Sequence, residues 1–410
     1  MMDVFVIGGG AAGMMAAIEA AVSGCKVTVF EKNEKLGKKI YITGKGRCNV
    51  TNASDMETIF ANINRNPKFL YSALYSYDNN AVMDFFEGEG VRLKVERGNR
   101  VFPESDHSSD IIRALERKLK SLGVKIRLNT CVERLIFTDD ACIGLEIKGG
   151  KKLLADKVIV ATGGASYPAT GSTGDGYEFA KSAGHSIVTP EPSLIPLVSP
   201  AQWVRDLQGL SLKNVELTLL SDNRPVYSEL GEMLFTHFGI SGPLVLSASA
   251  LYSTEKGKKK TVTLELDLKP GLDEDKLDKR ILRDFDEQKN RQFLNSLEGL
   301  VPKRLIPVLV EKSGIPAETK VNSVSKEQRK ALVNALKHFE IPISGMRPIE
   351  EAIITKGGVK VGEINPSTME SKKKKNLYFA GEVLDIDAMT GGFNLQLAWS
   401  TGYLAGRSED

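Results

Sequence analysis

Near the N-terminus, glycines and an acid stand at a spacing that suits the binding of a dinucleotide. Gly8, Gly10 and Gly13 form a G-x-G-x-x-G pattern, and Glu31 follows it. Gly8 permits a tight turn, Gly10 lets a pyrophosphate approach the backbone, and Gly13 lets a helix pack closely on a strand. Glu31 stands about 20 residues past the turn, where a carboxylate can accept hydrogen bonds from both ribose hydroxyls. The pattern predicts a site for the adenosine and pyrophosphate of a dinucleotide without a 2′-phosphate.

Two strands and a helix must position these residues. We predict a buried parallel strand at Asp3–Ile7, a helix of small residues at Ala11–Val22, and a second strand at Lys26–Phe30. The free N–H groups and the positive dipole end of the helix would then face the phosphates. An ordinary glycine-rich turn between strand and helix is the alternative.

Composition narrows the class of protein. The 410 residues predict two or three domains, and 41% hydrophobic residues are enough for large cores. With 55 basic and 52 acidic residues, the formal charge of +3 predicts no global affinity for nucleic acid. Short basic runs occur at Lys256 with Lys258–Lys260 and at Lys372–Lys375, and solvated turns explain them most simply.

Cysteine usage and hydropathy indicate the cellular setting. The four cysteines and four histidines form no C-x-x-C pair and no metal-ligand spacing, so we predict a reducing cytoplasm and no metal site. The N-terminus lacks a basic n-region, and no apolar run reaches membrane-spanning length. We therefore expect neither a signal peptide nor contact with a membrane.

A loop rich in glycine and lysine follows Glu31. A Walker A pattern would need a glycine five residues before Gly44, where Lys39 stands, so we exclude nucleoside triphosphate binding here. Polar loops beside a Rossmann turn usually touch a ligand, although a self-bonded network of Asn and Thr turns is the alternative. The hydrogen-bonding residues and glycines of this loop are Gly44, Gly46, Arg47, Asn49, Thr51 and Asn52.

In the middle of the chain, the sequence patterns predict first the remaining elements of the first domain and then an inserted region. Helical spacing occurs at 67–89 and 108–122, and strands are expected at 125–128, 132–138, 142–147 and 157–161. Gly174, Gly176 and Ala180 resemble a second dinucleotide turn, which we reject because no strand precedes them. Prolines at 190, 192, 196 and 200 mark the crossover out of this domain. Antiparallel strands at 215–220, 225–229, 232–236 and 261–268 predict a β domain, and the spacing over 273–339 predicts a small helical domain.

The C-terminal segment returns to strand signals at Glu351–Thr355 and carries a second group of chemically informative residues. A strand that ends at Ala380-Gly381-Glu382 places a carboxylate at the carboxyl edge of a parallel sheet, where ligands bind. Gly391 and Gly392 then open a helix whose unpaired N–H groups can face a negative atom. The alternative is a C-terminal amphipathic helix that docks without a ligand.

Together these motifs resemble those of the bacterial BaiN/RdsA-type NAD(P)/FAD-dependent oxidoreductases, within the glutathione-reductase-like and fumarate-reductase-like flavoproteins. The resemblance is carried by a hydrophobic strand ending in Ala161-Thr-Gly163, and by Thr43-Gly-Lys-Gly-Arg-Cys-Asn49, Phe235-Thr-His-Phe-Gly-Ile-Ser-Gly-Pro243, Gly381-Glu-Val-Leu-Asp385 and Gly391-Gly-Phe-Asn-Leu-Gln396. It implies an α/β fold whose discontinuous Rossmann-like FAD-binding domain (1–190 and 346–410) is interrupted by an antiparallel β domain (191–270) and a small helical domain (271–345). The redox-active cysteine pair of disulfide reductases is missing.

The resemblance also implies a tightly bound FAD, with Glu382 on the ribityl chain and the helix start at the flavin N1 and C2 carbonyl. A positive helix end there would stabilise an anionic reduced flavin. The residues predicted to contact the cofactor are Gly8, Gly10, Ala11, Ala12, Gly13, Glu31, Lys32, Gly37, Thr43, Gly44, Arg47, Cys48, Asn49, Val132, Ala161, Thr162, Gly163, Gly381, Glu382, Gly391, Gly392, Phe393, Asn394, Leu395 and Gln396.

For the reaction, we expect NAD(P)H to reduce the flavin, which passes hydride to an electron-poor C=C or C=N bond while a side chain or water supplies the proton. His237, Tyr167 and Cys48 are the candidate acids, and Arg47 could offset negative charge on flavin or substrate. Each has a structural alternative: His237 caps the helix starting near Gly242, Tyr167 packs, Cys48 fills a buried space, and Arg47 forms a surface salt bridge.

Substrate identity stays open at the level of sequence. No second glycine fingerprint with strand and acid exists, so the nicotinamide donor must bind transiently or in the inserted domains. The resemblance implies either an unsaturated small molecule of steroid type, which needs an apolar pocket, or ribosomal RNA in dihydrouridine formation, which needs a basic track. The two lysine runs favour RNA slightly. A flavin-binding protein with a structural FAD is a third hypothesis, and the sequence does not determine the oligomeric state.

Overall fold

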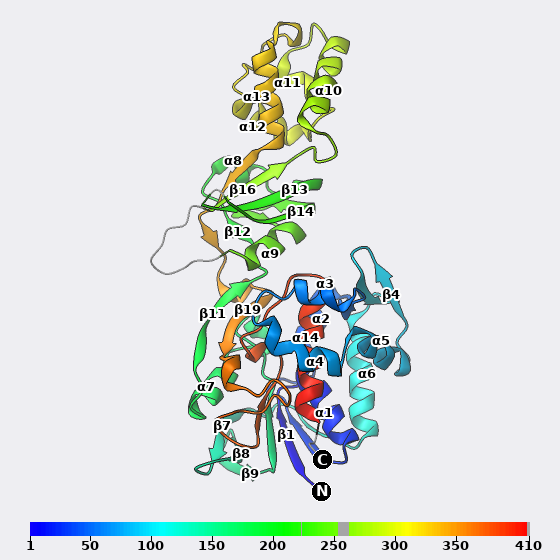
Figure 1. Cartoon of the computed structure of the whole chain (residues 1–410), viewed down its shortest axis with the longest axis vertical. Coiled ribbons are helices and arrows are strands. Elements are labelled where there is room, and N and C mark those ends of the chain that lie inside the picture. The colour runs from blue at the N-terminus through cyan, green and yellow to red at the C-terminus, as the bar shows by residue number, and fades with distance from the viewer. Residues whose placement is uncertain (223, 253–261, 408–410) are drawn as a thin grey trace. The chain divides into compact units, whose positions relative to one another are not determined.

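The chain consists of two compact units, one of them discontinuous in sequence. The computed structural model describes residues 1–222, 224–252 and 262–407 (Figure 1). Unit 1 comprises Met1–Ser193 and Pro348–Asp410, and unit 2 comprises Leu194–Arg347. The expected α/β class is confirmed, with a parallel Rossmann-like sheet and separate antiparallel sheets. The lysine run at 256–260 lies outside the described residues.

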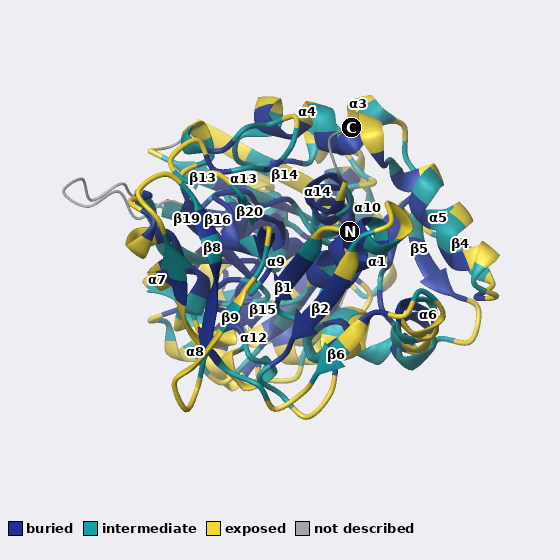
Figure 2. Cartoon of the chain, turned by 90° about the horizontal axis from the view of Figure 1, so that it is seen from below, coloured by how far each residue is buried: buried dark blue, intermediate teal, exposed yellow. Residues whose placement is uncertain are grey.

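A parallel sheet forms the centre of unit 1. Its strand order is β20-β10-β1-β2-β6, with all neighbours parallel. The strands are β1 (Asp3–Ile7), β2 (Lys26–Phe30), β6 (Lys125–Arg127), β10 (Lys157–Val160) and β20 (Leu377–Phe379). These apolar strands are mostly buried, as Figure 2 shows for β1 and β2, because both faces of such a sheet are covered. The carboxyl ends of β1, β10 and β20 therefore meet at one edge.

Some helices of unit 1 begin at capping side chains, others begin at glycines, and α4 and α6 begin at neither. The helices are α1 (Ala11–Val22), α2 (Lys38–Ile42), α3 (Met56–Ala61), α4 (Tyr71–Ser76), α5 (Asn79–Gly88), α6 (Ser108–Ser121), α7 (Asp175–Ser182) and α14 (Phe393–Gly406). Asp55 and Asp78 cap α3 and α5 by accepting backbone N–H bonds. By contrast, α1 and α14 begin at Gly10 and Gly392 without any side-chain cap.

Small antiparallel sheets complete unit 1. They are β3 (Thr51–Asn52) with β5 (Arg100–Pro103) and β4 (Leu93–Glu96); β7 (Val132–Phe137) with β8 (Cys142–Ile147) and β9 (Lys151–Leu154); and β11 (Ile187–Ser193) with β19 (Ile354–Val359). The strand expected at Glu351–Thr355 thus begins later, because Ile349–Glu351 forms a 3₁₀ turn. Pro190 and Pro192 lie inside β11 and not in a connecting loop, next to an irregularity of the ladder.

Unit 2 is built on an antiparallel sheet with the strand order β17-β16-β13-β14-β15-β12-β18. Its strands are β12 (Leu197–Val198), β13 (Ser211–Ser221), β14 (Arg224–Phe235), β15 (Gly239–Ser241), β16 (Val262–Asp267), β17 (Phe339–Pro342) and β18 (Gly345–Met346). Its helices are α8 (Gln202–Asp206), α9 (Pro243–Ala250), α10 (Glu274–Glu287), α11 (Phe293–Ser296), α12 (Ile306–Ser313) and α13 (Lys326–Lys337). Strand residues such as Leu266 and helix residues such as Leu336 belong to one hydrophobic core, and the division of this insert into a β domain and a helical domain stays a prediction.

Candidate functional site

In the glycine turn after β1, two glycines are packed against backbone atoms and one has free space beside it. A Cβ on Gly8, whose φ is +107°, would meet the Ala161 carbonyl oxygen at 2.4 Å, and a Cβ on Gly13 would meet the Gly8 carbonyl oxygen at 1.9 Å. A Cβ on Gly10 would meet nothing within 4 Å. Because α1 also starts there without a side-chain cap, its first N–H groups can serve a ligand anion.

Glu31 lies beside this turn at the carboxyl end of β2 and is 8% exposed. Its Oε2 accepts a hydrogen bond from the Gly9 backbone N–H at 2.8 Å, and its Oε1 accepts bonds from the Asn33 backbone N–H (2.8 Å) and Nδ2 (2.7 Å). A carboxylate has about four acceptor sites, so capacity remains for ribose hydroxyls. The carboxylate is therefore fixed in orientation before any ligand binds.

Other residues predicted at the adenosine end lie around Glu31. Gly37, with φ +67°, donates its N–H to the Gly9 carbonyl at 2.9 Å. The segment leading to Val132 is joined to β2 because Thr130 donates to the Glu31 carbonyl at 2.9 Å. Lys32, in contrast, binds Asp175 at 2.6 Å, so its ammonium group already has an anionic partner.

Close packing of α1 on α14 sets the distance between the two uncapped helix starts. A Cβ on Gly402 would meet the Ala12 carbonyl oxygen at 2.4 Å, and one on Gly406 would meet the Ala16 carbonyl oxygen at 2.5 Å. Moving four residues along α14, from Gly402 to Gly406, moves the contact four residues along α1 in the same direction, so the two helices run parallel. Gly402 lies ten positions after the N-cap of α14, whereas Ala12 lies two positions after that of α1. The two starts are therefore offset by about 12 Å along the axes, which suits an extended dinucleotide.

The start of α14 admits only glycine. Gly391 and Gly392 have φ values of +125° and +100°, and a Cβ on Gly392 would meet the Thr51 carbonyl oxygen at 2.3 Å. Nearby, Gly381, with φ +76°, would place a Cβ 2.8 Å from that of Ala12. The glycines predicted at the two ends of the cofactor thus belong to one packed edge of unit 1.

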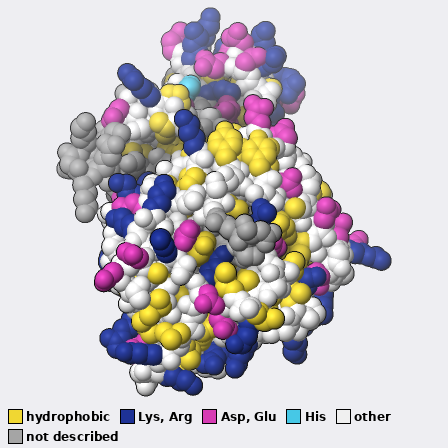
Figure 3. All heavy atoms as spheres, turned by 60° about the horizontal axis from the view of Figure 1, so that its bottom comes forward, with side chains coloured by type: hydrophobic (Ala, Val, Ile, Leu, Met, Phe, Trp, Pro, Cys, Tyr) yellow, Lys and Arg dark blue, Asp and Glu magenta, His cyan; other side chains and the backbone are white. Residues whose placement is uncertain are grey.

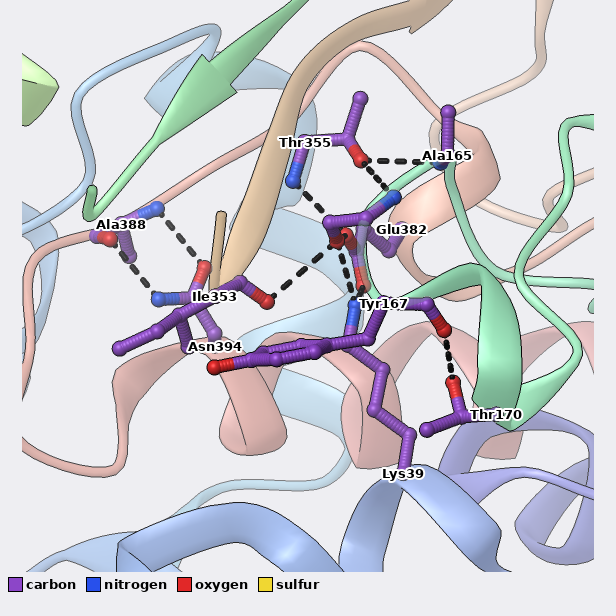
Figure 4. A network of polar contacts seen from close by, with 10 residues as sticks. Lys39, Ala165, Tyr167, Thr170, Ile353, Thr355, Glu382, Ala388 and Asn394 are labelled. Carbon is purple, nitrogen blue, oxygen red and sulfur yellow. Dashed lines mark hydrogen bonds and ion pairs between the residues drawn. The ribbon is translucent and has the colours of Figure 1, made fainter. Parts of the chain in front are cut away.

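Two of the four further residues predicted at the α14 start bind other parts of the protein. Asn394 accepts a bond from the Ala388 backbone N–H (3.0 Å) and donates to its carbonyl (2.8 Å), as Figure 4 shows. Gln396 is 1% exposed and binds Thr51 and the Tyr77 carbonyl. Phe393 is buried, whereas Leu395 is partly buried. Asn394 and Gln396 therefore hold the helix start in place, and any ligand contact there would come from the backbone.

Glu382 joins four segments of unit 1 (Figure 4). Its Oε1 accepts bonds from the Thr355 backbone N–H (2.8 Å) and the Ser166 hydroxyl (2.9 Å), while its Oε2 lies 2.6 Å from the Lys39 ammonium nitrogen. Thr355 Oγ1 in turn accepts the backbone N–H groups of Ala165 (2.9 Å) and Ser166 (3.0 Å). The carboxylate expected on a ribityl chain is thus already surrounded by donors.

The polar loop at 43–49 contains two residues that were candidates for catalysis. Arg47 forms ion pairs with Glu96 and Asp106 and lies 4.1 Å from the Phe102 ring centroid. Cys48 is fully buried, and burial raises the pKa of its thiol to about 12. Both arrangements agree with the structural alternatives, and neither favours proton transfer near neutral pH.

Two buried oxygens near these motifs lack a hydrogen-bond partner within the described part of the chain. They are Asn49 Oδ1, in the polar loop, and Thr162 Oγ1, directly after β10. Buried polar atoms are normally satisfied, so such atoms point to a group or a water that completes the site.

The other two candidate acids lie in different units. Tyr167, in unit 1, has a φ of +52°, and burial followed by the charge of Glu351 raises the pKa of its phenol. His237, in unit 2, is exposed in the turn between β14 and β15. The N-cap of α9 is Gly242 and has no side-chain cap, so the alternative that His237 caps this helix is wrong.

Asp387 is a buried acid that the motifs did not single out. It is 1% exposed, its Oδ2 accepts bonds from Asn64 and Ser193 (both 3.1 Å), and its Oδ1 has no partner among the described residues. Burial raises the pKa of this carboxyl. The signal available in the sequence was only its position four residues before Gly391, in a segment where acids alternate with apolar residues.

Neither a metal-ligand cluster nor a membrane-spanning helix occurs in the part of the chain that the structure describes. Within residues 1–222, 224–252 and 262–407, no three His, Cys, Asp or Glu side chains are grouped so as to hold a metal ion. In the same ranges, no helix has the length and apolar character needed to cross a membrane.

Comparison with known proteins gives full-length matches. The chain is 33% identical to the 3-dehydro-bile acid delta(4,6)-reductase of Clostridium scindens, covering 100% of this chain and 99% of the relative. It is 32% identical to the ribosomal RNA dihydrouridine synthase of Haemophilus influenzae, covering 97% and 96%. Among solved structures, a 3-ketosteroid delta1-dehydrogenase from Sterolibacterium denitrificans shares the fold, with a TM-score of 0.53 at 14% identity over 99% of this chain and 98% of that one.

A family model gives the assignment. The model described as the HI0933-like protein Rossmann domain matches residues 2–408. The resemblance predicted from the motifs is thereby confirmed, and the chain belongs to the HI0933-like Rossmann-domain family.

Proposed function

We propose that this protein is an FAD-dependent oxidoreductase that takes hydride from NAD(P)H and reduces an electron-poor C=C or C=N bond. The observation that carries the proposal is the pair of parallel, uncapped helix starts at Gly10 and Gly392, offset by about 12 Å beside Glu31. An anionic pyrophosphate at one start and an electron-rich ring at the other would both be stabilised by helix dipoles.

In this proposal the residues of unit 1 bind and orient the cofactor. Glu31 accepts hydrogen bonds from the adenosine ribose, and the open backbone at Gly10 faces the pyrophosphate. The N–H groups of Gly392 and Phe393 face the flavin pyrimidine edge. FAD, when bound, supplies hydride transfer, while the protein supplies position, electrostatics and the proton.

The names of the relatives support reduction of an unsaturated bond. A bile acid delta(4,6)-reductase and a dihydrouridine synthase both have products that carry added hydrogen. NAD(P)H as the donor is proposed from the family resemblance alone. All four cysteines are unpaired, which supports the proposed cytoplasmic setting.

The decisive experiment is to examine purified protein for flavin. It should be yellow, denaturation should release FAD and not FMN, and NADH or NADPH should bleach the flavin under anaerobic conditions. Colourless protein that takes up no added FAD would overturn the proposal. FAD that resists both nicotinamides would instead support a structural flavin or another donor.

A second candidate, reduction of uridine in RNA, is favoured by an exposed aromatic stack on α3 and α4. Phe60 and Tyr71 have ring centroids 4.4 Å apart, and the Tyr71 and Tyr75 rings are parallel at 6.1 Å. Tyr71 and Tyr75 are 49% and 67% exposed. Exposed aromatic rings of this kind stack on unpaired bases.

The basic residues give this candidate less support than the sequence suggested. Lys372, Lys373 and Lys374 donate to the carbonyls of Gly362, Gly184 and Asp139, so they tether loops. On the face drawn in Figure 3, Lys and Arg side chains are scattered among acidic and apolar ones. Deleting the gene and comparing RNA nucleosides with small metabolites would separate the two candidates. Loss of dihydrouridine would favour RNA, and an accumulated unsaturated metabolite would favour a small molecule.

A further inference from the structure

His185 is the only buried residue among the four histidines of the chain. It lies in the turn between α7 and β11, and its side chain is 0% exposed. The Phe379 ring of β20 packs against it, with the ring centroids 5.2 Å apart. Nδ1 lies 3.2 Å from Glu363 Oε2, and Nε2 lies 2.7 Å from Ser371 Oγ. The imidazole therefore joins this turn to the segment 361–376, which leads into β20.

The Ser371 hydroxyl determines which ring nitrogen of His185 carries the proton. Its oxygen accepts the backbone N–H groups of Lys373 (3.0 Å) and Lys374 (2.9 Å). A hydroxyl has two acceptor sites and one O–H, so the O–H is left for His185 Nε2. Nε2 is then unprotonated, and Nδ1 carries the proton that Glu363 accepts. The contacts are complete when the imidazole is neutral.

Glu363 supports the same assignment. Its Oε2 also accepts the Ser186 backbone N–H (2.9 Å), while its Oε1 accepts the Ser186 hydroxyl (2.9 Å) and lies 3.2 Å from Lys373 Nζ. Burial raises the pKa of this carboxyl, but the hydrogen bonds of Ser186 and the charge of Lys373 outweigh burial and lower the pKa to about 2. Glu363 is therefore an acceptor throughout the pH range in which a histidine titrates.

Protonation of His185 would disrupt these contacts. A second ring N–H, on Nε2, would point at a hydroxyl oxygen whose two acceptor sites are filled. The charged groups that act on the ring are Glu363 and Lys373, and the β20 residue packed on it, Phe379, carries no charge. Burial lowers the pKa of His185, Glu363 opposes this shift, and Lys373 adds to it. Acid therefore destabilises the closed arrangement.

We propose that His185 is a proton-sensitive latch, which fastens the segment 361–376 to the turn after α7 and releases it when the imidazole is protonated. β20 is the outermost strand of the parallel sheet, and Glu382 follows it closely in the chain. Release of the segment would therefore loosen the strand that presents this acid. Any effect on the cofactor rests on the proposed function, whereas the latch itself does not depend on FAD.

Hydrogen exchange followed by mass spectrometry tests the latch, with the data corrected for the intrinsic rate at each pH. Between about pH 7.5 and about pH 5.5, the opening constant of the segment 361–376 should rise about tenfold. The reason is that a released imidazole has the ordinary pKa of about 6.5 and takes up a proton, while the closed one stays neutral. His185→Gln does not titrate and should abolish the rise. His107→Gln removes an exposed imidazole from the same unit and should keep it, and α1 serves in every protein as the internal reference.

NMR of the histidine ring nitrogens checks the hydrogen-bond assignment independently. Near neutral pH, His185 should carry its proton on Nδ1. A proton on Nε2, an unchanged opening constant in acid, or an equal rise in α1 and in the segment 361–376 would overturn the inference. If His185→Gln does not fold, exchange and NMR of the wild type still decide, because His107→Gln, His237→Gln and His338→Gln assign the three exposed histidines.

Discussion

Glu31 is the side chain on which retention of FAD should depend most directly. Replacing it with Ala removes an acceptor for the ribose hydroxyls and also the contact that fixes the Gly9 backbone N–H. Hydrogen bonds to charged groups contribute about 1.5–3 kcal/mol each, so the dissociation constant of FAD should rise about tenfold to a hundredfold. Fluorescence titration of apoprotein measures it. Glu34→Ala, which removes an exposed acid three residues away, is the control, and equal affinity in both variants would exclude Glu31 from the ribose site.

Asp387 should make stability depend on pH in a predictable direction. Its pKa is raised in the folded protein, so the folded state binds more protons than the unfolded state above the ordinary aspartate value. Its stabilising contribution is complete below about pH 4 and is lost as pH rises through the raised pKa. The surrounding groups are Asn64, Ser193, Arg65 and Lys356, and the two cations limit the rise.

Asp387→Asn should remove that part of the pH dependence because an amide does not titrate. The melting temperature of the wild type should fall relative to that of the variant as the pH is raised from about 4. Thermal unfolding followed by circular dichroism across this range gives the comparison. Asp139→Asn, at an exposed position, should leave the wild-type profile unchanged. Parallel profiles for the wild type and Asp387→Asn would show that the buried carboxyl is not protonated on folding.

At the scale of elements, the close crossing of α1 and α14 carries a prediction about packing. Gly402→Ala places a methyl group against the Ala12 carbonyl oxygen at 2.4 Å, a contact with backbone that a rotamer change cannot relieve. Overpacking of this kind should lower the free energy of unfolding by about 1–3 kcal/mol and weaken FAD binding, since both helix starts would shift. Gly88→Ala at the end of α5 meets nothing within 4 Å and is the control. A Gly402→Ala protein as stable as this control would contradict the parallel packing.

The elements also show how far sequence reasoning extends. β1, α1 and β2 were predicted to the residue because a glycine turn, a run of small residues and two apolar strands all indicate the same local structure. β14 was predicted as two strands, but it runs unbroken through Gly231, where the absence of a side chain admits Leu244 of α9. This contact joins two elements of the tertiary structure, so the sequence around Gly231 does not indicate it.

The same limit applies to the candidate site. Gly8 and Gly392 were predictable because each reports a backbone constraint that the structure shows, whereas a Cβ on Gly10 would meet nothing within 4 Å. Glu382 and its partner Lys39 lie 343 residues apart, and the partners of Asp387 lie 323 and 194 residues from it, so no local pattern could indicate these contacts. A salt bridge was the structural alternative for Arg47, but its partners Glu96 and Asp106 lie 49 and 59 residues away in the chain and could not be identified from the polar loop.

For the molecule as a whole, the division into two units predicts that unit 1 can hold FAD by itself. Ser193 pairs with Ile354 in the β11–β19 ladder, so the chain leaves and re-enters unit 1 at adjacent points. Replacing residues 194–347 with a short Gly/Ser linker should therefore give a folded, yellow protein. Its dissociation constant for FAD should lie within about threefold of that of the full chain, a difference in binding free energy below about 1 kcal/mol. If the nicotinamide donor binds in the inserted unit, one of the two sites expected for it from the sequence, turnover should be lost while the flavin remains reducible by dithionite. An insoluble or colourless variant beside a yellow full-length protein would show that the cofactor domain is incomplete without residues 194–347.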